Sequence, residues 1–469
     1  MKGTDAKASG KLWSKWIGDR DFYAKVLLIL IPMIIQQGIT NLVNLLDNVM
    51  VGQLGTEPIS GVAVANQLIF VFNLMVFGLL AGASIFGAQF YGKGDYKGYH
   101  ETVRFRILAG LALGVIGWLV FALGGNLLFE LYLGGSEEAA TIAYAGKYMR
   151  IICWQLIPFA LVQSLGGALK DCGETRMPMQ ASVIAIFANL ILNYLLIYGS
   201  FGFPEMGIEG AALATVIARY LELLFIVIQI ARNFSRLTFL HGIFENFRIS
   251  AEVLVKMAAT GAPLFFNEAL WSSGLTLINS CYAIRGIEAV AATNINQTVW
   301  NLFGIICMSM GNAIGILSGQ RLGANDFEGA KDTVRKMIFL TITLNIGVGL
   351  IILLIAPYIP LLYNTEPEVR QLASQLLMVC GVMMPISAYT NASYFILRSG
   401  GKTVITFFFD CGFTWVACIP VAWLLCHRTG LGVLQIYMAV QSLELIKVVI
   451  GTILIKSGIW INNVLPEEA

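Results

Sequence analysis

The polar stretch QFYGKGDYKGYHETVR, residues 89–104, recurs as QRLGANDFEGAKDTVR at residues 320–335. The two copies share Gln, Gly, Asp, Gly, Thr, Val and Arg at the same steps, at an offset of 231 residues. Similarity between two apolar helices arises easily by chance, whereas identity along a polar loop does not. We therefore interpret the chain as a tandem repeat of one unit.

The same offset relates other parts of the two halves. GTEPISGVAVANQ (55–67) matches GIEAVAATNINQT (286–298), and Pro32 falls on Pro263. The duplication thus extends to the segments that precede the polar loop in each half.

The composition places this repeat in a membrane. Hydrophobic residues make up 57% of the 469 residues and charged residues 12%, whereas a soluble protein carries about 25% charged residues. The apolar residues come in blocks of twenty or more, the length that crosses a bilayer. We predict twelve membrane-spanning helices at residues 22–49, 60–88, 104–130, 141–168, 178–200, 207–233, 253–283, 289–317, 334–363, 367–397, 403–427 and 431–456.

The charges of the connecting segments predict the orientation. Basic residues occupy the N-terminus and every second loop, for example Lys93, Arg104 and Arg335. The loops between them carry mostly acids, for example Glu137 and Glu138. By the positive-inside rule, both termini are expected in the cytoplasm.

Six spans per repeat give both halves the same orientation, so the repeats are parallel and related by an axis along the membrane normal. The predicted fold class is an all-α membrane protein with twelve transmembrane helices in two six-helix bundles related by pseudo-two-fold symmetry. Its predicted parts are a cytoplasmic N-terminal tail (1–21), an N-lobe (22–233), an inter-lobe linker (234–252), a C-lobe (253–456) and a cytoplasmic C-terminal tail (457–469).

Several function classes are disfavoured. The net charge is +2, so no bulk field points to nucleic acid. Eight cysteines without a CxxC pair and three scattered histidines indicate neither a disulfide framework nor a metal site. The sequence has no Walker motif, no nucleophile–base motif in a usable place and nothing that resembles a channel filter. We expect a protein that is not an enzyme and that has no cofactor, with H⁺ or Na⁺ as a transported ion.

Four segments together resemble the multidrug and toxic compound extrusion (MATE) transporters. They are LDNVMVGQLG (46–55), the GxGD-type loop at 92–95, ANLILNYLLIYG…GIEGAALATVIAR (188–219) and GAPLFFNEALWSSG (261–274). The resemblance covers essentially the whole chain, in order. It implies twelve helices in two bundles around a central cavity, and export of mostly cationic amphiphiles driven by inward sodium or proton movement.

Asp47 is the first candidate coupling residue. A charge at membrane depth costs on the order of a few kcal/mol, so an acid there is expected to have a functional or structural role. Polar residues at 37, 41, 44 and 48 recur at helical spacing beside it, and such a stripe is expected to line an interior or a hydrated cavity. A buried carboxylate can hold a proton or a cation. The alternative is a structural carboxylate bonded to neighbouring helices.

The resemblance implies that Asn189, Asn193 and Thr215 complete a coupling-ion site with Asp47 in the N-lobe. Position 193 is Asn where relatives of one branch carry Asp, which removes one charge. Asn and Thr oxygens still suit a hard cation. Polar packing between helices is the alternative role for these residues.

Three residues are candidates for cation or substrate binding in the C-lobe, namely Glu268, Asn279 and Asp410. Glu268 and Asn279 share the seventh predicted helix, and a structural role is the alternative for Glu268. Asp410 lies in the eleventh, where it could face the cavity or pair with a basic loop residue such as Lys402. Other branches of the resembled family place a functional glutamate in the seventh helix and an aspartate in the tenth, and the tenth predicted helix here has no acid.

Two further mid-helix acids are interpreted as members of local ion pairs. Arg219 precedes Glu222 by three residues, and Lys447 follows Glu444 by three. Residues at this spacing share one face of a helix.

A proline marks a candidate hinge in each half. Pro32 and Pro263 lie in the first and seventh predicted helices. Each ring removes one backbone hydrogen bond, so both helices are expected to bend there. A fixed kink without motion is the alternative.

The sequence predicts a secondary antiporter that exports small, mostly cationic organic compounds, driven by inward proton or sodium movement. We expect a monomer in the inner (plasma) membrane whose partners are organic cations and the lipid bilayer. The alternative is a lipid-linked oligosaccharide flippase of the same superfamily, which would need several intramembrane bases to hold a diphosphate. One proton can neutralise Asp47, and Asn193 supplies no second charge for sodium, so we favour proton coupling.

Overall fold

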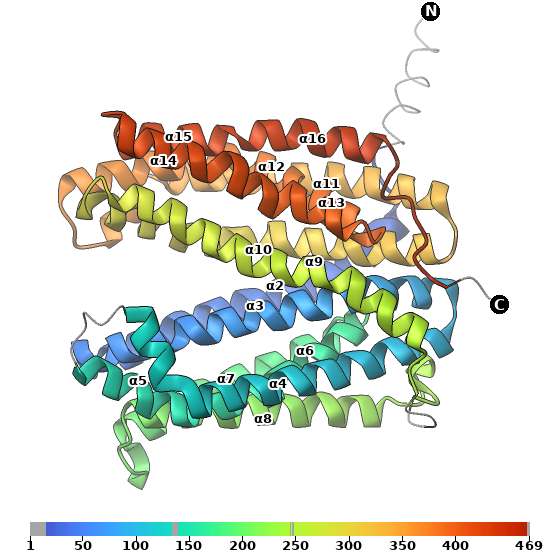
Figure 1. Cartoon of the computed structure of the whole chain (residues 1–469), viewed down its shortest axis with the longest axis horizontal. Helices are drawn as coiled ribbons and strands as arrows, with labels where there is room; N and C mark the ends of the chain where they lie inside the picture. The colour runs from blue at the N-terminus through green and yellow to red at the C-terminus, as the bar shows by residue number, and fades with distance from the viewer. Residues whose placement is uncertain (1–15, 134–138, 244, 246–247, 467–469) are drawn as a thin grey trace, which may run out of the picture. The chain divides into compact units, whose positions relative to one another are not determined.

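The computed structural model describes residues 16–133, 139–243, 245 and 248–466. Residues 1–15 of the predicted N-terminal tail, the loop acids Glu137 and Glu138, and the side chain of Asn48 lie outside this description. The regular structure of the described part is helical throughout (Figure 1). Its long helices are α2 (Arg20–Gly52), α3 (Thr56–Lys93), α4 (Tyr96–Leu133), α5 (Ala139–Ile152), α6 (Leu156–Asp171), α7 (Arg176–Tyr198), α8 (Ile208–Arg232), α9 (Ala251–Ala283), α10 (Ile287–Gly323), α11 (Phe327–Ile355), α12 (Pro367–Ser399), α14 (Ile419–Arg428), α15 (Val433–Ser442) and α16 (Glu444–Lys456).

These helices account for the twelve predicted spans. Eleven segments of the described chain are long and apolar enough to cross a membrane. The twelfth, α9, has the length, at 33 residues, but polar residues such as Asn267 and Glu268 interrupt its apolar sequence. The predicted all-α class is therefore confirmed.

The repeated polar loop starts a helix in the same way in both halves. Asp95 accepts a hydrogen bond from the backbone N–H of Gly98 (3.0 Å), and Asp326 accepts one from Gly329 (2.9 Å). Each aspartate is thus an N-cap, which satisfies a free donor of the first turn. This cap explains why α4 and α11 begin earlier than the apolar pattern predicts.

A close helix crossing explains the repeated Gln and Gly. A Cβ on Gly92 would collide with the backbone oxygen of Gln320, and a Cβ on Gly323 would collide with that of Gln89. The two contacts are equivalent under the repeat. Gln89 corresponds to Gln320, and Gly92 corresponds to Gly323, each at an offset of 231 residues. The repeat therefore marks a backbone-to-backbone contact between α3 and α10 that only glycine permits.

The described chain folds into two compact units. The N-unit comprises Ile31–Gly87 and Asp95–Gly261, and the C-unit comprises the described residues up to Leu30, Ala88–Gly94 and the chain from Ala262. Three boundaries fall inside helices, one of them after Gly87 in α3. The other two lie directly before the Ile–Pro pair of Pro32 in α2 and the Ala–Pro pair of Pro263 in α9. Both candidate hinges thus lie where a helix passes from one unit to the other.

Prolines shorten or divide two predicted helices. The predicted helix 141–168 is split into α5 and α6 by a 3₁₀ turn, Cys153–Gln155. Pro158 has no N–H to continue the α-helical pattern at this point, and the tighter turn accommodates the gap. The ninth predicted helix ends at Ile355, earlier than predicted, because Pro357 follows.

The predicted inter-lobe linker is held against α4. His100 Nε2 lies 2.9 Å from the backbone oxygen of Phe239. Arg104 donates from Nε to the oxygen of Ile243 (2.9 Å) and from Nη1 to that of Arg248 (3.1 Å). The linker therefore belongs to the N-unit.

The described part of the C-terminal tail is packed. Trp460 is only 2% exposed. Gln89 donates to the backbone oxygens of Ser399 (2.9 Å) and Asn462 (3.2 Å), and it accepts from the N–H of Val464 (2.9 Å). The tail thus completes the polar environment of the repeated glutamine.

Candidate functional site

Two polar contacts join α2 and α7 along one face. Gln36 Nε2 donates to Ser182 Oγ (2.6 Å), and Asn193 Nδ2 donates to Asp47 Oδ1 (2.6 Å). Both contacts join residues 146 positions apart, as parallel neighbours in constant register do. Eleven residues separate the two layers on each helix, which is three turns or about 16 Å.

Amide groups surround Asp47. Asn193 donates to Oδ1, and its side chain is buried. The orientation of Asn189 that satisfies both ends of its amide directs the nitrogen to Asp47 Oδ2 (3.1 Å) and the oxygen to Thr215 Oγ1 (3.2 Å). Such orientations are assigned from the network of donors and acceptors. The structure thus brings together all four residues predicted for the N-lobe site, from α2, α7 and α8.

A second layer surrounds Glu222 on α8. Ser182 Oγ donates to Glu222 Oε1 (2.5 Å), and Arg219 Nη1 donates to Oε2 (2.8 Å). The Glu222 side chain is 3% exposed and that of Arg219 is 32% exposed. The predicted local ion pair is confirmed, and Ser182 connects it to Gln36.

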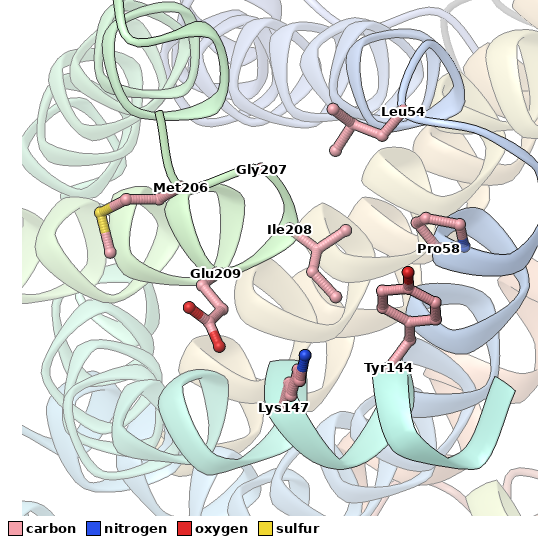
Figure 2. Close-up of a pocket in the computed structure, with 8 residues that line it drawn as sticks. All are labelled: Leu54, Pro58, Tyr144, Lys147, Met206, Gly207, Ile208 and Glu209. Atoms are coloured by element: carbon pink, nitrogen blue, oxygen red, sulfur yellow. The ribbon is translucent and has the colours of Figure 1, made fainter. Parts of the chain in front are cut away.

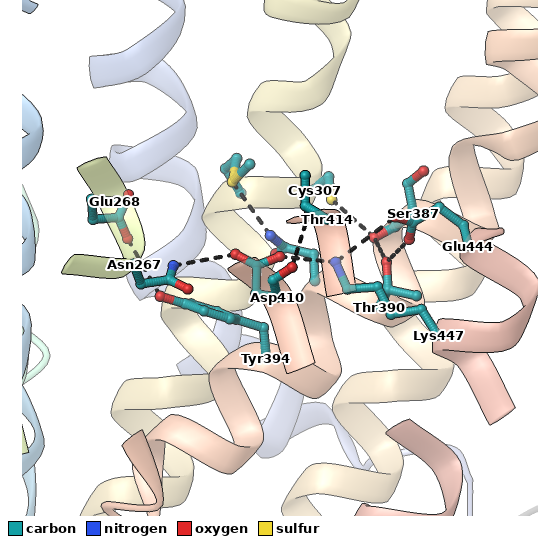
Figure 3. A network of polar contacts seen from close by, with 12 residues as sticks. Asn267, Glu268, Cys307, Ser387, Thr390, Tyr394, Asp410, Thr414, Glu444 and Lys447 are labelled. Carbon is teal, nitrogen blue, oxygen red and sulfur yellow. Dashed lines mark hydrogen bonds and ion pairs between the residues drawn. The ribbon is translucent and has the colours of Figure 1, made fainter. Parts of the chain in front are cut away.

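In the C-unit, Asp410 is paired with a base from another helix (Figure 3). Lys447 Nζ lies 2.8 Å from Asp410 Oδ1 and 3.8 Å from Glu444 Oε1. The predicted Glu444–Lys447 pair is therefore present, but the closer partner of the lysine is Asp410. The sequence suggested Lys402 in the loop as the base that pairs with Asp410, but the structure pairs Asp410 with Lys447.

Glu268 lies at the other end of the same network. The hydroxyl of Tyr394 donates to Glu268 Oε1 at 3.4 Å, and Asn267 Nδ2 donates to Asp410 Oδ2 at 3.2 Å. Arg398 interacts electrostatically with Glu268. Among the described residues of this cluster there are three acids and two bases, namely Glu268, Asp410 and Glu444, and Arg398 and Lys447.

Asp410 and Asn279, the other two C-lobe candidates, differ in local structure and in position. Asp410 lies in a π-helical turn, Phe408–Gly412, a form that is frequent at functional sites. Asn279 lies eleven residues beyond Glu268 on α9, about 16 Å along the helix, and its side chain is exposed. The structure therefore does not bring Asn279 to the Glu268 cluster.

Two important contacts are not evident from single helices. Ser182 links Gln36 to Glu222, and Lys447 links Asp410 to Glu444. A usable signal for the first was the equal spacing of polar residues on two helices, since Ser182 precedes Asn193 by the same eleven residues that separate Gln36 from Asp47.

A pocket of about 280 Å³ opens elsewhere in the N-unit (Figure 2). Lys147 and Glu209 supply its charged side chains, and Tyr144, Ile208 and Leu54 are among its other lining residues. Asp47 does not line it. The pocket contains charges of both signs and does not coincide with either cluster, so it is not assigned to the candidate site.

Comparison with known proteins relates the whole arrangement to membrane transporters. The chain is 23% identical over 438 residues to "Probable multidrug resistance protein NorM" of Thermotoga maritima, covering 93% of this chain and 92% of the relative. It is 28% identical to "Probable multidrug resistance protein YoeA" of Bacillus subtilis, covering 88% of each chain.

Solved structures share the fold. A MOP superfamily transporter from Pyrococcus furiosus has a TM-score of 0.85 at 20% identity, covering 95% of this chain and 97% of that chain. A multidrug resistance MATE family transporter in an outward-facing conformation has a TM-score of 0.86 at the same identity and coverage.

The family model MatE matches residues 32–195 and 263–424, one segment in each half of the repeat. These two segments contain all the residues of the Asp47 and Glu268 sites except Thr215 and the α16 residues Glu444 and Lys447. The protein is thus a multi-pass membrane protein, and it belongs to the MatE family of transporters.

Proposed function

We propose that this protein exports small, mostly cationic organic compounds across the plasma membrane by antiport, driven by inward movement of protons. The observation that carries the proposal is the Asp47 carboxylate, which lies in the apolar helix α2 and is contacted by neutral amide groups of α7. The names of its relatives as probable multidrug resistance proteins support the substrate class. The excess of acid over base in the Glu268 cluster supports a cationic substrate.

The donors around Asp47 are not suited to bind a sodium ion. A sodium ion needs several oxygen ligands directed at it, as other hard cations do. Around Asp47, Asn193 and Asn189 direct amide nitrogens at the carboxylate. These N–H groups stabilise an ionised carboxylate and do not complete a cage of oxygens.

Protonation of Asp47 would disturb the contact between α2 and α7. An ionised carboxylate accepts hydrogen bonds at both oxygens, whereas a protonated one has an O–H donor in place of one acceptor. That donor would face an amide N–H of Asn189 or Asn193, so either the contact breaks or the amide turns its oxygen toward Asp47. Where the contact breaks, the outer part of α2 is free to move, and Pro32 provides a point where the helix can bend.

The proposal is tested with purified protein in liposomes that contain a fluorescent organic cation. Proton and sodium gradients are imposed separately at a fixed membrane potential, and Asp47→Asn serves as the matched variant. We expect a pH gradient to drive cation movement without sodium in the unmodified protein and not in Asp47→Asn. Movement that follows neither gradient would refute antiport.

A further inference from the structure

Arg219 occupies a position between the two polar layers of the N-unit. It lies four residues after Thr215 of the Asp47 layer and three before Glu222. Its guanidinium donates to Glu222 and stands 5.3 Å from the centre of the Phe159 ring. Its side chain is 32% exposed, so it is far less enclosed than that of Glu222.

The same guanidinium acts on Asp47. Arg219 lies one turn of α8 after Thr215, whose hydroxyl contacts Asn189 beside Asp47. Its positive charge therefore acts on the Asp47 carboxylate as well as on Glu222. A long, partly exposed arginine side chain can reach different acceptors by changing rotamers. One base on α8 therefore lies within electrostatic range of two acids.

Glu222 keeps partners when Arg219 is taken away. Ser182 Oγ donates to its other oxygen at 2.5 Å. Lys170, at the end of α6, also interacts electrostatically with Glu222. A buried carboxylate without any partner is strongly unfavourable, so these two groups make a transfer of Arg219 feasible.

We propose that Arg219 is an exchangeable internal counter-ion. It is paired with Glu222 while the α7 amides hold Asp47, as in this structure, and it is drawn to Asp47 when those contacts have opened and the proton leaves. This inference rests on the proposed function, which makes Asp47 the proton-binding group. An organic cation that reaches Asp47 then displaces Arg219, which returns to Glu222. At each stage Asp47 is protonated, held by amides or paired with a cation, and Glu222 keeps its hydrogen bond from Ser182.

The other groups around Asp47 carry no positive charge. The Tyr148 hydroxyl interacts with Asp47 electrostatically and donates to Asn66 (3.4 Å). The amides from α7 are neutral. Among these described neighbours, Arg219 is thus the charged group that acts on Asp47.

The test measures binding of a fluorescent organic cation to the purified full-length protein as a function of pH. Arg219→Gln removes the internal competitor, so we expect tighter cation binding at high pH, by severalfold. It also removes the positive charge that favours ionised Asp47, so the midpoint of binding should move up by about one pH unit. Arg219→Lys keeps the charge and should leave the midpoint within a few tenths of a unit.

Glu222→Gln should shift the pH midpoint of cation binding in the opposite direction. It frees Arg219 to pair with Asp47, so the midpoint should move to lower pH. If Arg219→Gln cannot be purified in folded form, this variant carries the test, and an unchanged or higher midpoint overturns the proposal.

A double variant distinguishes an Arg219 that exchanges between Glu222 and Asp47 from an Arg219 that stays in place and acts as a fixed charge. In the Glu222→Gln background Arg219 is fully committed to Asp47, so adding Arg219→Gln should shift the midpoint more than it does alone. Strictly additive shifts indicate two independent charges and overturn the exchange.

Asp47→Asn separates this inference from the proposed function. If its cation binding retains the pH dependence of the unmodified protein, Asp47 is not the proton-binding group and the proposed function fails. If Asp47→Asn abolishes the dependence while Arg219→Gln leaves midpoint and affinity unchanged, only the counter-ion proposal fails.

Discussion

Lys447 holds its ammonium group 2.8 Å from Asp410 and 3.8 Å from Glu444, so one base serves acids from two helices. Its side chain is 9% exposed and that of Asp410 is 17% exposed. Thr390 donates to the remaining oxygen of Glu444 (2.8 Å), and Asn267 donates to that of Asp410 (3.2 Å). The network fixes α9, α12 and α16 to the π-helical turn that carries Asp410.

Replacing the shared base should destabilise the C-unit. Lys447→Met leaves two partly buried acids without their common partner, and we expect a loss of about 2 kcal/mol in the free energy of unfolding. The double variant Lys447→Met, Asp410→Leu removes one of those acids and should recover part of the loss. Thermal unfolding in detergent measures both. Equal stability of Lys447→Met and the unmodified protein would contradict the structural role of the pair.

Glu268 should be required for transport and dispensable for folding. Its contact with Tyr394 is long, at 3.4 Å, and it belongs to a cluster in which acids outnumber bases. Glu268→Gln keeps the shape and removes the charge. We expect coupled export to be abolished in vesicles at an unchanged expression level. Normal export by this variant would exclude a role for Glu268 in cation binding.

The crossing of α3 and α10 should not tolerate a side chain. Gly92→Ala places a methyl group against the backbone of Gln320, so the helices must separate at a cost of about 2–3 kcal/mol. Gly347→Ala is the matched control, because a Cβ there meets no atom within 4 Å. Melting temperatures in detergent should fall for Gly92→Ala and remain or rise for the control. A fall of the same size in both would point to a general effect of glycine replacement.

The sequence predicted the elements well because membrane helices are set by long apolar blocks, and the repeat supplied an independent check. It predicted the boundaries less well where local chemistry decides them. The N-cap at Asp326 and the helix-ending Pro357 are both readable signals, yet neither changes the apolar pattern. The place of the tail, with Trp460 buried, depends on contacts with distant segments and has no local signal.

The candidate sites were likewise predicted in part. Asp47, Asn189, Asn193 and Thr215 were predicted together through a resemblance, and the structure brings them together. The partner of Asp410 was missed because Lys447 lies 37 positions away on another helix, and a choice among several bases needs tertiary structure. Asn279 shares a helix with Glu268, but sequence proximity on α9 does not make them neighbours.

The predicted orientation can be tested at the C-terminus. Alternating basic loops place both ends of the chain in the cytoplasm. A reporter enzyme that is active only outside the cytoplasm, fused after the last residue, should therefore be silent. The same reporter inserted after Phe203, between α7 and α8, should be active and is the positive control. Activity of the C-terminal fusion would contradict the twelve-span assignment.

The identity of the coupling ion depends on a single amide next to Asp47. Asn193 donates to the carboxylate and adds no charge, so one proton neutralises the site completely, whereas a sodium ion finds few oxygens directed at it. Asn193→Asp adds a second carboxylate in contact with the first. It should raise sodium affinity and convert pH-driven export into export that sodium also drives, while Asp47→Asn should abolish both. Transport is measured at fixed membrane potential with pH and sodium varied independently. Export that follows sodium in the unmodified protein and persists in Asp47→Asn would move the coupling site to Glu268.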